Sequence, residues 1–228
     1  MKIATWNVER RKYKKSLDEI VAVCNQVKAD IFVLTETDEQ VRLNYRYCFQ
    51  TPTPPDIKLS RYGKPLRYQP TEHRISIFTN YQCIWQHITF DKYTALCVEL
   101  ETERGSLLVY GTIIGVLGNR HPSFGEALIK QIEDYKRQSA GKGELCICGD
   151  FNCSFADNYY FTKAGKNLIL QSFSENYIKL LTADRPFCID HIAISEQFIT
   201  DCEIQVEEWN LEKTLSDHKG IAVQFTQI

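Results

Sequence analysis

Polar side chains lie at the ends of apolar, strand-like runs at five places in this chain of 228 residues, after the run at three places and before it at two. Carboxylates and carboxamides offer oxygen ligands to hard cations such as Mg²⁺, and His and Asp side chains can move protons during catalysis. Because neighbouring strands can end at one rim of a sheet, the five places could converge on one site. The side chains concerned are Asn7, Glu36, Asp150 with Asn152, Asp190, and Asp217 with His218.

Two of these motifs invite other interpretations. In isolation, Gly149-Asp150-Phe151-Asn152 is typical of a turn, because Asp and Asn side chains hydrogen-bond to nearby backbone. Ser216-Asp217-His218 contains the residue types of a nucleophilic triad. Three consecutive side chains cannot all face one another, however, and a triad is defined by spatial roles. We therefore do not interpret this motif as a triad.

The elements that must position these residues begin with a β-α-β unit. Residues 1–7 form an apolar run typical of a strand, and residues 30–36 form a continuous apolar run that suits a strand buried on both faces. Between them, Ser16 and Glu19 have the spacing of a capping box, and apolar residues follow at helical period. Residues 50–72 contain five prolines and little periodicity, so we expect a long surface loop there.

The rest of the chain predicts more strands than helices. Runs at 75–79, 83–90, 94–101 and 107–114 are separated by short turns, which predicts consecutive antiparallel strands. A second capping box, Ser123 with Glu126, predicts a helix, and residues 158–166 suggest a short helical or irregular stretch. Further strands are expected at 145–148, 189–194, 203–209 and 220–225. We expect one domain over residues 1–228, with two sheets and external helices, although the pattern leaves an ordinary α+β layer open.

Composition excludes several classes of protein. The 27 Lys and Arg residues are balanced by 29 Asp and Glu residues, so no broad basic surface exists for non-specific binding to nucleic acid or anionic lipid. The nine cysteines contain no C-x-x-C pair, which argues against a zinc site and favours reduced thiols in a cytoplasmic protein. We find no signal peptide and no apolar run near the roughly 18 residues that a membrane span needs.

Five segments spanning positions 5 to 218 together resemble, in their order, the motifs of the endonuclease/exonuclease/phosphatase family, which includes proteins similar to exonuclease III and DNase I. The resemblance implies an α+β fold, a four-layered αββα sandwich of two mixed β-sheets flanked by helices. It also implies divalent-metal-dependent hydrolysis of phosphate esters at the place where loops of the two sheets meet. The matching segments are Thr5-Trp6-Asn7, Asp30-x-x-x-Leu34-Thr35-Glu36, Gly149-Asp150-Phe151-Asn152, Ile189-Asp190-His191-Ile192 and Ser216-Asp217-His218.

The same resemblance implies how the metal and the attacking water are held. Glu36 is the expected main ligand of Mg²⁺ or Mn²⁺, with Asn7 and Asp217 completing the set. Mg²⁺ is usually held by one or two carboxylates together with waters and substrate, which fits so few acidic residues. Asp150 is expected to orient and deprotonate the attacking water, and Asn152 to position that water or the phosphate.

A histidine is expected to stabilise negative charge on the phosphate. By resemblance, His218 would lie against a phosphoryl oxygen, and Asp190 would hold its ring in the right tautomer and favour the cation. The neighbouring His191 should face the opposite way along its strand, so we interpret it as structural.

One segment departs from the family pattern. Tyr110 matches a phosphate-contacting tyrosine of some members, whereas Ile113 stands where the family usually has His or Asn and cannot donate a hydrogen bond. Asn119 and His121 follow shortly afterwards and could supply the missing donor from a loop. They could equally be solvated loop residues.

Two short basic stretches suggest a phosphate-rich substrate. Residues 9–15 and 58–74 contain ten basic and two acidic residues, so the rest of the chain is distinctly acidic. Tyr13, Tyr62 and Tyr68 lie among them and could stack on a base or sugar. The alternative is a solvated face without a partner. The predicted substrate-binding residues are Arg61, Lys64, Arg67 and Arg74.

These observations predict a metal-dependent hydrolase acting on a phosphate ester, with a preference for phosphodiesters and nucleic acid as one candidate substrate. A phosphomonoesterase remains an alternative. So does a catalytically impaired binding module that retains the fold, an interpretation favoured by Ile113 and opposed by the other motif residues. The sequence does not indicate an oligomeric state.

Overall fold

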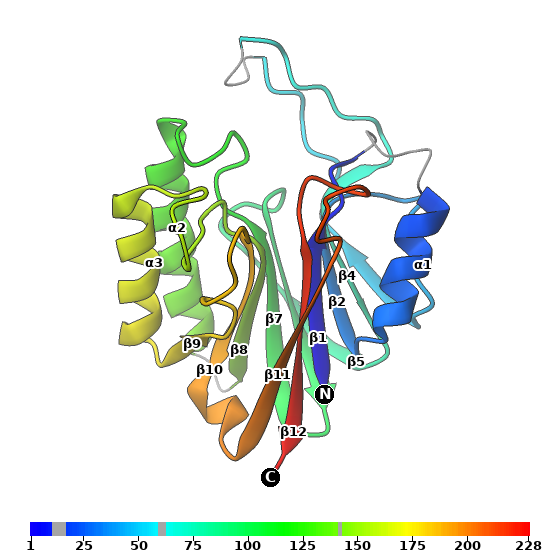
Figure 1. Cartoon of the computed structure of the whole chain (residues 1–228), viewed down its shortest axis with the longest axis vertical. Helices are drawn as coiled ribbons and strands as arrows, with labels where there is room; N and C mark the ends of the chain where they lie inside the picture. Colours follow the sequence, from blue (N-terminus) through cyan, green and yellow to red (C-terminus); the bar gives the residue numbers. More distant parts are fainter. Residues whose placement is uncertain (11–16, 59–62, 141–142) are drawn as a thin grey trace.

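The chain folds as two β-sheets packed face to face, with helices on both outer faces (Figure 1). A computed structural model describes residues 1–10, 17–58, 63–140 and 143–228. Each sheet has six strands and mixes parallel with antiparallel pairs. The predicted α+β fold, a four-layered αββα sandwich, is confirmed.

The first sheet is built around the β-α-β unit predicted at the start of the chain. Its strands lie in the order β11 (Cys202–Trp209), β12 (Gly220–Gln227), β1 (Lys2–Asn7), β2 (Ile31–Asp38), β4 (Glu72–Thr79) and β3 (Tyr47–Gln50). The β1 and β2 strands are parallel, and α1 (Leu17–Val27) connects them across the outer face. The other pairs in this sheet are antiparallel.

The second sheet repeats this arrangement with a different parallel pair. Its strands lie in the order β5 (Gln82–His87), β6 (Ala95–Thr102), β7 (Gly105–Ile113), β8 (Glu144–Asp150), β10 (Asp190–Ser195) and β9 (Ile178–Leu180). The β7 and β8 strands are parallel and are connected by α2 (Ser123–Ser139). α3 (Lys163–Glu175) lies beside α2 on the same outer face, and the short 3-10 helix η2 (Glu196–Ile199) follows β10 (Figure 1).

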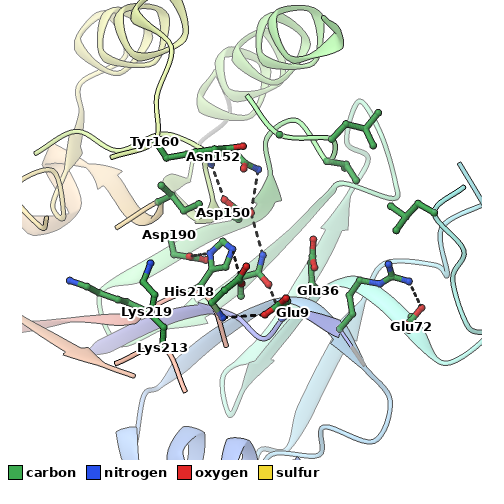
Figure 2. A pocket seen from close by; sticks show the side chains of 18 of the residues that line it. Glu9, Glu36, Glu72, Asp150, Asn152, Tyr160, Asp190, Lys213, His218 and Lys219 are labelled. Atoms are coloured by element: carbon green, nitrogen blue, oxygen red, sulfur yellow. Dashed lines mark hydrogen bonds and ion pairs between the residues drawn. The ribbon is translucent and has the colours of Figure 1, made fainter. Parts of the chain in front are cut away.

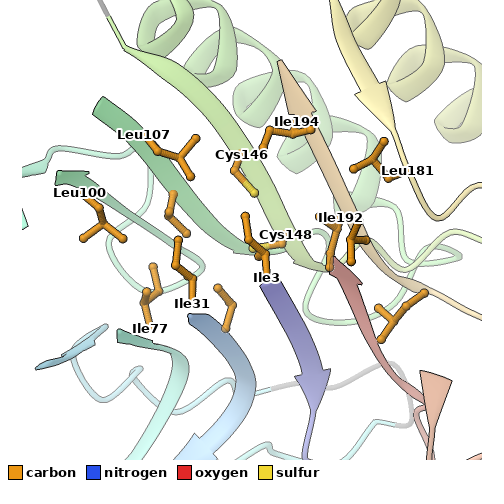
Figure 3. Packing of buried hydrophobic residues seen from close by; sticks show 14 of the residues in the cluster. Ile3, Ile31, Ile77, Leu100, Leu107, Cys146, Cys148, Leu181, Ile192 and Ile194 are labelled. Carbon is orange, nitrogen blue, oxygen red and sulfur yellow. The ribbon is translucent and has the colours of Figure 1, made fainter. Parts of the chain in front are cut away.

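Three apolar layers hold the sandwich together. Between the sheets, aliphatic side chains such as Ile3 and Ile77 of the first sheet meet Leu107 and Ile192 of the second (Figure 3). On the outer faces, Trp6 and its neighbours pack against α1, while Tyr110 and its neighbours pack against α2 and α3. Strands buried on both faces explain the continuous apolar runs in the sequence.

Four sequence predictions are corrected or left open by the structure. β4 and β5 are consecutive and close in sequence but belong to different sheets, so they do not pair. Ser123 starts α2 without capping it: no side-chain cap bond is formed, and the Ser123 amide donates to Nδ1 of His121. The helix expected at 158–166 begins later, at Lys163, and continues to Glu175. The Ser16 capping box lies outside the described residues.

The proline-rich segment after β3 is the expected long loop. Its described part contains one antiparallel bridge, between Ile57 and Leu66, and it extends beyond the rim of the sandwich (Figure 1). In the part of the chain that the structure describes, no helix is long and apolar enough to cross a membrane.

Candidate active site

A cavity of about 720 Å³ opens at the rim between the two sheets (Figure 2). The β1, β2 and β8 strands point their carboxyl ends towards this rim, and the antiparallel β10 and β12 begin there. The predicted convergence therefore occurs. The cavity is lined by Asn7, Glu36, Asp150, Asn152, Asp190, Asp217 and His218, among others.

Two of these side chains belong to residues with a left-handed backbone conformation. In β2, Leu34 faces α1, so a regular strand would turn Glu36 to that side as well. The positive φ of Glu36 (49°) instead accompanies a side chain that lines the cavity, and Asn152 has the same φ. Such left-handed residues cost about 1–3 kcal/mol and persist where the surrounding structure enforces them.

Gly149 permits the strand end that carries Asp150. It has a φ of 138°, and a Cβ added there would lie 2.1 Å from the carbonyl oxygen of Thr112 on the neighbouring β7. A larger residue would force β8 away from β7 at the point where Asp150 enters the cavity.

Hydrogen bonds fix the Asp150 carboxylate from two sides. Its Oδ2 accepts from Nδ2 of Asn7 (3.2 Å) and from Nδ2 of Asn152 (3.3 Å), and its Oδ1 accepts from the Asn152 amide (2.8 Å). Burial raises the pKa of Asp150 to about 7, although the charge of His218 opposes the shift. The group therefore lies in the range where a carboxylate can accept a proton at neutral pH.

Asp190, which is buried, and His218, which is partly exposed, form a pair beside Asp150. Oδ2 of Asp190 lies 2.5 Å from Nδ1 of His218, and Asp190 is directly opposite Asp150 in the β8–β10 ladder. Burial alone would lower the pKa of His218, but the negative charge of Asp190, followed by those of Asp150 and Asp217, raises it to about 10. The His218 carbonyl oxygen is itself held by Nε1 of Trp6 (3.0 Å) and Nδ2 of Asn210 (2.7 Å).

Glu9 is a lining carboxylate that the sequence analysis missed. Its Oε2 accepts from the Asp217 amide (3.2 Å), and its own amide donates to Oδ1 of Asn7 (2.9 Å). Strand alternation could not have identified it, because β1 ends at Asn7 and Glu9 has a left-handed φ of 52°. Glu9, Glu36 and Asp217 thus place three carboxylates around one cavity.

The oxygen atoms at this rim suit a hard divalent cation. Burial raises the pKa of Glu36, and among the described residues none donates a hydrogen bond to its carboxylate. Within the described ranges, no cluster of three or more His, Cys, Asp or Glu is close enough to hold a metal unaided. Mg²⁺ commonly uses only one or two carboxylates with waters and substrate, so these residues fit Mg²⁺ or Mn²⁺.

The structure does not bring Tyr110, Asn119 or His121 to the site. Tyr110 is fully buried on the α2 side of β7, where its hydroxyl donates to Asp134 (2.6 Å), so its predicted phosphate contact is wrong. Asn119 is buried, and its Nδ2 donates to the Asn152 carbonyl (2.8 Å). His121 is exposed and contacts Ser123 at the start of α2. Neither Asn119 nor His121 places a hydrogen-bond donor in the cavity that could replace the His or Asn expected at the position of Ile113.

Only some of the predicted basic residues line the cavity. Lys64 and Arg67 line the cavity, and Arg61 lies outside the described residues. Arg74 is buried, and its guanidinium donates to the Tyr68 hydroxyl (2.9 Å), so its predicted direct contact with substrate is not supported. The opposite wall contains residues that the sequence analysis missed, because they lie in loops without a pattern: Tyr159, Tyr160, Phe187, Lys213 and Lys219.

Solved structures of phosphate-ester enzymes share this fold. A 3′ phosphatase, NExo from Neisseria, superposes with a TM-score of 0.72 at 16% identity, covering 99% of both chains. An AP endonuclease from Archaeoglobus fulgidus gives 0.71 at 11% identity, again over 99% of both chains. A family protein from Leptotrichia buccalis gives 0.67 at 14% identity with the same coverage.

The chain thus shares its fold with a 3′ phosphatase and an AP endonuclease. Residues 4–218 match the sequence model of the Endonuclease/Exonuclease/phosphatase family, and the chain belongs to that family. No curated protein sequence matches the chain significantly.

Proposed function

We propose that this protein is a divalent-metal-dependent phosphoesterase that hydrolyses phosphodiester bonds by attack of an activated water. One observation carries the proposal: a carboxylate with a raised pKa, an Asp–His pair and the glutamates Glu9 and Glu36 line the same cavity. Ester hydrolysis needs a base, a stabiliser of phosphoryl charge and a counter-charge for the phosphate, and these groups can supply all three.

Asp150 is the proposed general base. Its hydrogen bonds to Asn7 and Asn152 hold the carboxylate in one orientation, and its pKa of about 7 suits proton transfer at neutral pH. Asn152 also donates to the Ile114 carbonyl (3.0 Å), so it ties the base to the adjoining loop. We therefore assign Asn152 a positioning role beside any contact with water or phosphate.

His218 is the proposed cation at the phosphoryl group. Asp190 accepts from Nδ1, and Nε2, which lies 3.6 Å from Oδ1 of Asp217, is the proposed donor for a phosphoryl oxygen. The neighbouring carboxylates keep the ring protonated, so it can stabilise the negative charge that grows in the transition state.

Glu36 is the proposed principal metal ligand, with Glu9, Asn7 and Asp217 as the other candidates. Mg²⁺ or Mn²⁺ bound there would neutralise phosphate charge and polarise the phosphoryl group. Asn7 would serve two purposes, because its amide nitrogen already donates to Asp150.

Basic side chains on both walls favour a substrate with phosphate on each side of the cleaved bond. Arg10, Lys64 and Arg67 line one wall, and Lys213 and Lys219 line the other. Tyr159 and Phe187 pack edge to face at 5.6 Å between ring centres and remain half exposed in the cavity wall. Such a cavity suits a nucleic acid or another polyanionic diester, and we propose nucleic acid as the partner and the cytoplasm, where free thiols persist, as the location.

The direct test is hydrolysis of bis(4-nitrophenyl) phosphate, 4-nitrophenyl phosphate, and single- and double-stranded DNA, each with Mg²⁺, Mn²⁺ or EDTA. We expect metal-dependent turnover of at least one diester that is faster than monoester turnover and is lost in Asp150→Asn. Faster monoester turnover would favour the phosphomonoesterase. If no substrate turned over with either metal, the impaired binding module suggested by Ile113 would replace our proposal.

Salt dependence tests the polyanion. Each phosphate contact that is lost should lower the slope of log affinity against log salt by roughly 0.7–0.9. Replacing both Lys64 and Arg67 with Ala should therefore flatten the slope of oligonucleotide binding measured in EDTA. An unchanged slope would show that this wall does not contact the substrate.

A further inference from the structure

Arg10 lies where the chain leaves β1 at the rim of the cavity. Glu9 and Arg10 both have left-handed backbone conformations, with φ of 52° and 60°. Both side chains line the cavity, together with Glu36, Asp150 and His218. The end of β1 thus contributes a carboxylate and a guanidinium to the same space.

Three contacts hold the Arg10 guanidinium in place. Its Nη2 donates to Oε2 of Glu72 at 2.8 Å and to the Arg67 carbonyl oxygen at 2.5 Å. The guanidinium also lies over the Tyr68 ring, 4.3 Å from its centre. Glu72 is almost completely buried and is labelled at the side of the cavity in Figure 2. A guanidinium held in this way loses little side-chain freedom when it binds a ligand.

Arg10 nevertheless keeps unused donor capacity. Among the residues that the structure describes, none accepts a hydrogen bond from its Nε, although that atom is buried. Both hydrogen bonds that the guanidinium donates to described residues use Nη2. Although burial dominates the environment of Glu36, the positive charge of Arg10 acts on it to lower its pKa, so the two side chains share one electrostatic environment.

The opposite sheet lacks a donor at the corresponding place. Ile113, Asp150 and Asp190 are neighbours on β7, β8 and β10, so Ile113 occupies the position beside the proposed base. Ile113 is apolar, and Asn119 and His121 are engaged elsewhere. The second sheet therefore offers the phosphate no donor from β7.

We propose that Arg10 binds a non-bridging oxygen of the substrate's phosphate and supplies the charged donor that Ile113 does not. This inference rests on the proposed phosphoesterase function, since it assigns a residue to that same site. Guanidinium groups bind phosphate through two parallel hydrogen bonds, which Lys cannot reproduce at a stacked position. Arg10 is then a substrate-binding residue, and Glu72 and Tyr68 are the residues that position it.

The first experiment compares Arg10→Gln and Arg10→Lys in steady-state hydrolysis of bis(4-nitrophenyl) phosphate with Mg²⁺. We expect Arg10→Gln to lower kcat/KM by about 100-fold and Arg10→Lys to recover only a small part of it. Arg42→Gln, which removes an exposed arginine outside the cavity, is the matched control and should retain full activity. Wild-type activity in Arg10→Gln would overturn the proposal.

A second variant separates phosphate binding from a structural role. If Arg10 only neutralised buried Glu72, the double variant Arg10→Gln with Glu72→Gln would regain activity, because no unpaired carboxylate would remain. If Arg10 binds phosphate, the double variant stays as inactive as Arg10→Gln alone. Recovery of activity in the double variant would therefore contradict the proposal.

Binding measurements keep this inference separate from the proposed function. Affinity for a fluorescent 5′-phosphorylated oligothymidylate, measured in EDTA, should fall about tenfold in Arg10→Gln and remain unchanged in Arg42→Gln. Absence of turnover in the wild type, with this difference in affinity intact, would reject the proposed activity but support Arg10 as the phosphate contact. Equal affinity of wild type and Arg10→Gln would reject Arg10 whatever the activity.

Discussion

Two polar clusters lie on opposite faces of the second sheet, and only one of them, which His218 joins from the loop before β12 of the first sheet, lines the cavity. The rim cluster, at the edge of the cavity, consists of Asp150, Asn152, Asp190 and His218. The helix-side cluster, beneath α2 and α3, consists of Tyr110, Thr112, Gln131, Asp134, Thr182 and His191. Apart from the partly exposed His218, the side chains of both clusters are buried, and short hydrogen bonds join members of each cluster.

The two clusters differ in charge balance and in access. On the helix side, Tyr110 donates to Asp134, and Thr112 donates to Gln131 at 2.7 Å. The rim cluster has two carboxylates for one histidine, Oδ1 of Asp190 has no hydrogen-bond partner within the described ranges, and the group faces a cavity. Burial and hydrogen bonding therefore do not identify a site, whereas excess charge beside an opening does. Changes in the rim cluster should cost activity, and changes on the helix side should cost stability.

The largest effect is expected from the rim cluster itself. Asp150→Asn and His218→Asn should each lower kcat by about 100- to 1,000-fold, because each removes a base or a charge that acts in the transition state. Hydrolysis of the best diester substrate measures this loss, and circular dichroism should show an unchanged fold. His121→Asn is the control, since that histidine lies outside the cavity. Near-wild-type activity in both rim variants would show that the rim cluster is not needed for hydrolysis.

The next effect concerns the metal. Glu36→Gln should lower activity by about 100-fold at a fixed Mg²⁺ concentration and raise the Mg²⁺ concentration for half-activation at least about tenfold. A titration of activity against Mg²⁺ measures both changes, with exposed Glu101→Gln as the control. An unaltered titration curve would show that Glu36 is not a ligand.

On the helix side, the expected loss is in stability. Tyr110→Phe removes the hydrogen bond to the buried Asp134 carboxylate and should lower the free energy of unfolding by about 1–3 kcal/mol. Urea denaturation measures this change, and kcat should remain that of the wild type. Tyr177→Phe, at an exposed tyrosine, is the control. If Tyr110→Phe lowered kcat and left the free energy of unfolding unchanged, Tyr110 would belong to the site.

On the same face of the sheet, His191 should affect only the pH dependence of stability and leave activity at neutral pH unchanged. Burial lowers the pKa of His191 to about 4, against an ordinary value of 6.5, so the unfolded chain binds a proton in this range that the native state does not. The free energy of unfolding should therefore fall as the pH drops from 6.5 to 4, by up to about 1.4 kcal/mol per pH unit from this group. His191→Asn should remove that part of the slope in denaturation curves measured at pH 7, 6 and 5. An identical slope in the variant would show that His191 is protonated in the native state.

The sequence predicted most of the strands and the convergence of the site, because buried runs and strand ends are visible in residue types. It also placed His191 away from the site, since neighbouring residues in a strand face opposite sides. The prediction that Tyr110 contacts the phosphate was wrong because it ignored the same alternation. Gly111 and Ile113 face the other sheet, so Tyr110 faces the helices. Which sheet receives β5 is decided by packing between sheets, which no local pattern records.

The side chains in the loops were largely unpredictable. Glu36 enters the cavity only because its φ is left-handed, and a carboxylate at that point of a regular strand would face α1. Lys213 and Tyr159 meet at 3.0 Å, between Nζ and the hydroxyl, across 54 positions of sequence. Contacts between residues so far apart in sequence depend on the completed fold, so the sequence identified the cavity residues at the strand ends better than those in the loops.

The bond from Trp6 to the His218 carbonyl gives the site an optical reporter. Trp6 and Trp209 pack edge to face at 6.0 Å behind the His218 loop, whereas Trp85, the third tryptophan of the chain, is 65% exposed on β5. In a Trp85→Phe background, tryptophan fluorescence would come from the pair behind His218 alone. Rearrangement of that loop upon ligand binding could then be followed in real time without an added label.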